Sequence, residues 1–143
     1  MGNNFNDSKK GNHNEVFTEK DFALVPAERI NEVADMKGHD FSQKIKTNQI
    51  RNFFSHFNTL RNEFKQRKIT KMEFQELDAS LILIKPKLAY AKGRNRKVED
   101  FKELMFEVID KVYKSNNKEK AYENFFEFVE AIVAYHKYYG GKD

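Results

Sequence analysis

The sequence predicts an all-α protein, a compact bundle of four to five helices that follows a flexible N-terminal arm. Apolar residues recur at three- and four-residue intervals in several segments, as they do on one face of a helix. No segment shows the apolar and polar alternation of a strand bounded by turn residues. With 143 residues, of which 39% are hydrophobic, the chain has the size of a single domain with one core.

The N-terminal segment is polar. Residues 1–20 are rich in Asn, Lys and Gly and hold only three large apolar side chains, among them Phe17. This is too little apolar surface to offset the entropy lost on ordering the segment. We therefore expect a flexible arm over residues 1–21 and one helical domain over residues 22–143.

The first helices follow this arm. Pro26 suits the first turn of a helix, and the apolar spacing after it predicts a short helix that ends at Gly38. The strongest pattern follows Thr47, where six apolar residues share one face: Ile50, Phe53, Phe54, Phe57, Leu60 and Phe64. It predicts a long helix over about residues 48–67.

Thr70 and Glu73 have the spacing of a capping box, so the next helix is expected to begin there and to continue to about Ala91. Pro86 lies inside this run and cannot donate a backbone hydrogen bond. We expect a kink at Pro86 or a break near Lys85.

The last two helices are predicted over about residues 97–114 and 118–139. The acidic residues of the first of these, with Lys102 and Lys111 as neighbours, are expected on a solvated face. The second is apolar over more than half of its circumference and ends at Gly140 and Gly141. Such a helix lies at the centre of its bundle or also faces another chain.

Positive charge is concentrated in two segments. Residues 44–71 hold eight Lys or Arg against one acidic residue, and residues 85–97 hold six Lys or Arg and no acidic residue. The rest of the chain is acidic, and the total is only +4. Local basic segments of this kind are typical of a surface that binds a polyanion, although solvated helix faces can look the same.

The face of the first long helix opposite its phenylalanines is polar. Its cations, amides and hydroxyls recur at helical spacing: Arg51, Ser55, Asn58, Asn62 and Lys65, with Asn52 and Thr59 alongside. Cations meet phosphate oxygens, and Asn, Ser and Thr bond phosphate or the ribose 2′-hydroxyl. This face therefore favours contact with a sugar-phosphate backbone over base reading.

We find no catalytic, metal or cofactor site in the sequence. There is no cysteine, and the four histidines fall in separate regions: His13, His39, His56 and His136. The one basic loop with a glycine, at Gly93, lacks P-loop spacing. The chain is therefore predicted not to be an enzyme. No apolar stretch approaches the roughly 20 residues of a membrane span, so we expect a cytoplasmic protein with no membrane partner.

Three runs resemble the small subunit of the type III-A CRISPR Csm effector complex. LIKPKLAYAKGR at residues 83–94 is similar to a signature of that family, and TNQIRNF at residues 47–53 looks like its first long-helix motif. Residues 125–141 look like its C-terminal helix. The resemblance covers about residues 44–143.

The resemblance implies a non-catalytic bundle, stacked in several copies beside the other Csm subunits along guide RNA (crRNA) and target RNA. Sequence specificity would come from pairing between guide and target. The family motifs place RNA contacts at five positions: Arg51, Lys85, Lys87, Lys92 and Arg94. Charge alone suggests five more: Lys44, Lys46, Arg61, Lys65 and Arg96. Tyr90 is expected to pack the kinked helix against the bundle.

Three other interpretations stay open. A free-standing helix-turn-helix protein would bind DNA, but it needs a short turn and a recognition helix that reads bases. A protein-interaction scaffold would use the basic segments on acidic partners. A nuclease with an unrecognised site would degrade RNA in the presence of a metal ion.

Overall fold

A computed structural model of the chain describes residues 15–90 and 96–141, and within these ranges it contains helices and no strand. The all-α prediction is confirmed. A 3₁₀ turn, η1 (Phe22–Leu24), precedes six helices: α2 (Ala27–Ser42), α3 (Thr47–Thr70), α4 (Phe74–Ile82), α5 (Ile84–Ala89), α6 (Arg96–Tyr113) and α7 (Lys118–Tyr138). α4 and α5 are the two halves of the predicted kinked helix.

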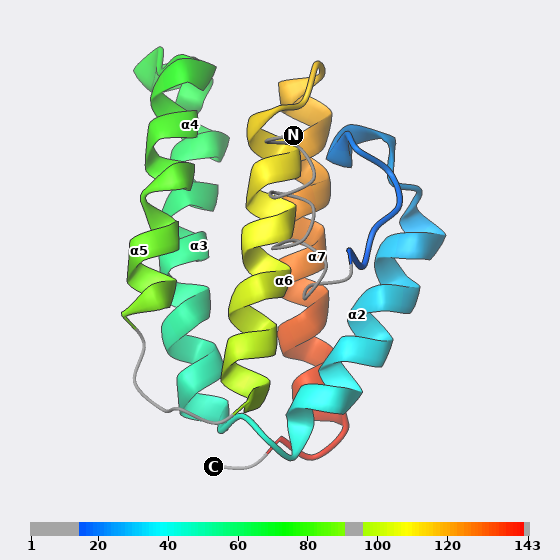
Figure 1. Cartoon of the computed structure of the whole chain (residues 1–143). Helices are drawn as coiled ribbons and strands as arrows, with labels where there is room; N and C mark the ends of the chain where they lie inside the picture. Colours follow the sequence, from blue (N-terminus) through cyan, green and yellow to red (C-terminus); the bar gives the residue numbers. More distant parts are fainter. Residues whose placement is uncertain (1–14, 91–95, 142–143) are drawn as a thin grey trace, which may run out of the picture.

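The helix α7 is central. In Figure 1, α6 and α7 stand in the middle of the bundle, α2 lies on one side, and α3 with α4 and α5 lies on the other. α7 packs against α2, α3, α6 and η1, and its broad apolar face is buried by these elements. Burial within the bundle therefore accounts for that face. The predicted stop is also confirmed, because Gly140 has a φ of 81° and the Gly141 N–H donates to the His136 carbonyl at 2.9 Å.

The predicted start of α4 is wrong by one turn. Thr70 is the last residue of α3, and its hydroxyl donates to the Gln66 carbonyl at 3.2 Å. α4 begins instead at Phe74, where the Glu73 N–H donates to Oε1 of Glu76 at 2.9 Å. The Thr70 hydroxyl is already used by the preceding helix, so it does not cap the next one.

The break between α4 and α5 lies at Leu83, two residues before the predicted position at Lys85. Pro86 is consequently the third residue of α5. The first N–H groups of a helix have no partner within that helix, so a proline there loses no hydrogen bond. The break places Pro86 where it is tolerated.

Gly38 does not end α2, and this prediction is wrong. The helix continues to Ser42, and Gly38 is buried where α2 crosses α7. A Cβ atom at Gly38 would lie 2.5 Å from Cβ of Tyr135 and 3.1 Å from the backbone N of His136. The two helices therefore approach each other closely at Gly38.

Gly38→Ala is expected to destabilise the protein by about 1–3 kcal/mol, because α2 and α7 must move apart to accept the methyl group. This is the net loss that remains after the roughly 1 kcal/mol by which alanine improves helix propensity. Urea denaturation measures the difference. Gln75→Ala, at an exposed position of α4, is the control and should change stability by less than about 0.5 kcal/mol. A Gly38→Ala protein as stable as the parent would contradict this close approach.

Residues 15–21, which the sequence assigned to a flexible arm, pack against the bundle; we call them the strap. Phe17 is fully buried, with its ring centroid 5.0 Å from that of Phe22 and 5.1 Å from that of Phe128. The rest of the predicted arm, residues 1–14, lies outside the described residues. The prediction of a flexible arm is therefore corrected for residues 15–21, which pack against the bundle.

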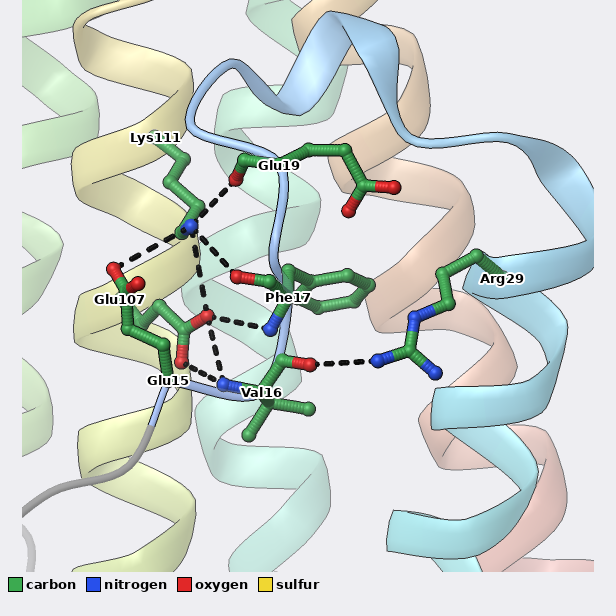
Figure 2. A network of polar contacts seen from close by, with 7 residues as sticks. All are labelled: Glu15, Val16, Phe17, Glu19, Arg29, Glu107 and Lys111. Carbon is green, nitrogen blue, oxygen red and sulfur yellow. Dashed lines mark hydrogen bonds and ion pairs between the residues drawn. The ribbon is translucent and has the colours of Figure 1, made fainter.

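The strap is held by Glu107 and Lys111 of α6, which we call the anchor pair (Figure 2). Glu107 accepts hydrogen bonds from the backbone N–H groups of Val16 at 2.9 Å and Phe17 at 2.8 Å. Lys111 Nζ donates to the carbonyls of Phe17 at 2.9 Å and Glu19 at 2.5 Å. The sequence placed this pair on a solvated face, whereas Glu107 is 7% and Lys111 6% exposed.

Candidate nucleic-acid interface

The polar face of α3 lies on the surface of the bundle. Its apolar side is buried, with Ile50, Phe57 and Leu60 each at most 2% exposed. We call the opposite face the α3 ridge, and all of its residues are exposed: Arg51, Asn52, Ser55, Asn58, Thr59, Asn62 and Lys65. Apolar residues at helical spacing therefore fix the direction in which the ridge points.

The second basic segment reaches the same region through α5, which packs against α3. Partial burial, together with the positive charge of Lys87, lowers the pKa of His56 on α3 below its usual value. The two basic segments thus meet beside the α3 ridge.

Five of the cations predicted from sequence are exposed and form no ion pair with any residue in the described ranges: Lys46, Arg51, Lys65, Lys87 and Arg96. Lys44 is also exposed, in the segment between α2 and α3. Lys92 and Arg94 lie outside the described residues.

Two of the predicted cations have anionic partners within the bundle. Nζ of Lys85 lies 2.6 Å from Oδ1 of Asp110 on α6 and 5.1 Å from the ring centroid of Phe106. Nη1 of Arg61 lies 2.6 Å from Oε2 of Glu130 on α7. A phosphate would have to displace a carboxylate at each, so these two cations hold helices together.

Sequence reasoning did not single out Lys68 and Lys71, which are exposed and have no ion pair in the part of the chain that the structure describes. Lys71 ends α3 in the left-handed conformation, with a φ of 63°. It lines a groove of about 460 Å³ between α3 and α4, together with Asn62, Gln66 and the acidic residues Glu63 and Glu76. The signal was present in sequence, because both lysines belong to the first basic segment.

The expectation for Tyr90 is wrong. Its side chain is 81% exposed, whereas Ile84 and Leu88 are the buried residues of α5. Tyr90 follows the last turn of α5 and does not face the core. It therefore does not pack α5 against the bundle.

His136 and His39 contact different partners in the bundle. Nε2 of the buried His136 lies 2.6 Å from the Ile45 carbonyl oxygen, and the ring of His39 packs on Tyr139 at 4.3 Å. The Tyr139 hydroxyl donates to Asp35, and this bond raises the pKa of Tyr139 to about 12. Within residues 15–90 and 96–141, no three His, Asp or Glu side chains are placed to hold a metal ion. Nor does any helix in these ranges have the length and apolar character of a membrane span.

Comparison with known proteins places the bundle in a family. The family model described as "Csm2 Type III-A" matches residues 25–142. The chain belongs to this Csm2 family. A curated relative from Streptococcus thermophilus, named "CRISPR system Cms protein Csm2", is 31% identical over 99 residues, which cover 69% of this chain and 76% of the relative. No solved structure gives a significant match.

Membership in the Csm2 family confirms the resemblance found in the three sequence runs. Csm2 proteins are structural subunits of the type III-A CRISPR complex, so the partners of this chain include the other Csm subunits. The strap precedes residue 25, where the family match begins, whereas the anchor pair lies within the match.

Proposed function

We propose that this Csm2 chain binds the sugar-phosphate backbone of guide RNA and target RNA in the type III-A complex, in several stacked copies and without catalysis of its own. The observation that carries the proposal is the α3 ridge beside Lys87, where exposed cations with no carboxylate partner among the described residues flank a row of amides and hydroxyls. Such a surface attracts a polyanion and gives it hydrogen-bond partners along its length.

The distribution of ion pairs supports this assignment. Lys85 and Arg61, which face α6 and α7, are neutralised by carboxylates. Arg51, Lys65 and Lys87 point to solvent and are not neutralised by any described carboxylate. Positive charge that is not used by the fold is therefore available on the side of the bundle formed by α3 and α5.

Arg51→Ala combined with Lys87→Ala is expected to weaken RNA binding by about tenfold or more, because each cation that meets a phosphate releases counterions. Fluorescence polarisation with a labelled single-stranded RNA measures the affinity. If about three to five phosphates are neutralised per copy, log K should fall with log salt at a slope of roughly −2 to −3.5 in the parent and less steeply in the variant.

Lys114→Ala combined with Lys137→Ala is the matched control, because both lysines are exposed on other elements and have no ion pair with the described residues. The control should bind RNA as the parent does. A flat salt response in the parent would contradict backbone binding. RNA degradation by the purified chain that depends on a metal ion would contradict the absence of catalysis.

Assembly distinguishes this proposal from the other interpretations. Co-expression with the other Csm proteins should yield a ribonucleoprotein that holds several copies of the chain and RNA of uniform length. A double variant at Arg51 and Lys87 that keeps its RNA affinity and fails to assemble would indicate a protein scaffold. A preference for duplex DNA would indicate a free-standing DNA-binding protein.

A further inference from the structure

We infer that the α3 ridge distinguishes RNA from DNA, because the hydroxyl oxygens of Ser55 and Thr59 accept hydrogen bonds from ribose 2′-hydroxyl groups. This inference rests on the proposed RNA binding and adds a specificity to it. The residues concerned are exposed side chains between Arg51 and Lys65.

The hydrogens of both hydroxyls are used within α3. Oγ of Ser55 donates to the Asn52 carbonyl at 2.7 Å, and Oγ1 of Thr59 donates to the Ser55 carbonyl at 3.2 Å. A hydroxyl group has one hydrogen to donate and two lone pairs that accept. Ser and Thr side chains in helices commonly donate such hydrogen bonds to carbonyl groups of the preceding turn. The two side chains therefore present acceptors to solvent.

An acceptor discriminates between the groups of a nucleic-acid backbone. Phosphate oxygens carry no hydrogen, so they cannot bond to an oxygen whose own hydrogen is already used. The ribose 2′-hydroxyl is both donor and acceptor, and it is the group that deoxyribose lacks. The backbone group that Ser55 and Thr59 can bind is thus the one that is specific to RNA.

The neighbouring side chains on the ridge are suited to bind the phosphates. Arg51 lies one turn before Ser55 on the ridge, and Lys65 lies beyond Thr59. The amides of Asn58 and Asn62 are exposed, and each has both donors and acceptors. Cations at the two ends of the ridge can hold phosphates while the two hydroxyls, one turn apart, meet the sugars between them.

The inference is tested with four labelled oligonucleotides of one sequence: RNA, 2′-fluoro RNA, 2′-O-methyl RNA and DNA. The 2′-fluoro sugar keeps the pucker of RNA but has no hydrogen to donate, so it separates hydrogen bonding from shape. We expect the full-length chain to bind RNA about fivefold or more tightly than each of the other three. Equal affinity for RNA and 2′-fluoro RNA would overturn the inference and leave the proposed RNA binding intact.

Ser55→Ala combined with Thr59→Val should reduce RNA affinity to that of DNA and leave the salt slope unchanged, because no charge is removed. Arg51→Ala is the contrasting variant, and it should weaken RNA and DNA alike. A Ser55 and Thr59 variant that still prefers RNA as the parent does would overturn the inference. Failure of the parent to bind any of the four oligonucleotides would instead overturn the proposed function, and the inference with it.

Discussion

Phe17→Ala is expected to lower the free energy of unfolding by about 3–5 kcal/mol, the usual cost of removing a fully buried phenylalanine. The ring of Phe17 is enclosed by those of Phe22 and Phe128, in edge-to-face contact with both. Its loss leaves a cavity that these rings fill only in part. Urea denaturation followed by circular dichroism measures the change.

Thr18→Ala is the control, because Thr18 is the next residue of the strap and is exposed. It should change stability by less than about 0.5 kcal/mol. If Phe17→Ala were equally harmless, the strap would be undocked in solution, and the flexible arm would extend to residue 21 as its composition suggests.

The sequence could not reveal the strap, because its partners lie far away in the chain. Composition measures the apolar area of a segment, and residues 1–20 have little of it. The hydrogen bonds that hold the strap to the anchor pair join its backbone to side chains 90 or more residues later. Glu107 and Lys111 stand four residues apart on α6, which is also the spacing of a solvated ion pair. Local pattern cannot tell the two situations apart.

The long helices were predictable because their patterns are long. The phenylalanine stripe gave α3 and the apolar pattern of residues 118–139 gave α7, each to within a few residues of the observed ends. Errors arose where one residue has two possible roles. Gly38 allows a close helix crossing instead of a stop, and Thr70 bonds its own helix instead of capping the next. Tertiary neighbours decide between such roles.

The candidate site was predictable as a charged region but not residue by residue. Runs of Lys and Arg located both basic segments, and helical spacing gave the exposed face of α3. Sequence could not show that Asp110 pairs with Lys85 or that Glu130 pairs with Arg61. The members of such a pair are distant in the chain, and Arg61 and Glu130 lie 69 positions apart. Ion pairs thus separate cations that support the fold from those left for a ligand.

Lys111→Met is expected to destabilise the protein by about 3–5 kcal/mol, the usual cost of removing one member of a buried ion pair. Nζ of Lys111 lies 3.9 Å from Oε2 of Glu107, and both side chains are buried. The carbonyls of Phe17 and Glu19 also lose their donor. Denaturation in urea measures the loss, and amide hydrogen exchange at Val16 should become faster, because the strap is released.

A double-mutant cycle shows whether the anchor pair acts as a unit. Glu107→Leu combined with Lys111→Met removes both charges, so it should cost less than the sum of the two single variants. Lys102→Met is the control for a partly exposed ion pair. Nζ of Lys102 lies 3.0 Å from Oε1 of Glu99 at the surface of the same helix. Its replacement should cost at most about 1 kcal/mol. If Lys111→Met were no more costly than Lys102→Met, Lys111 would be solvated, and the anchor pair would not hold the strap.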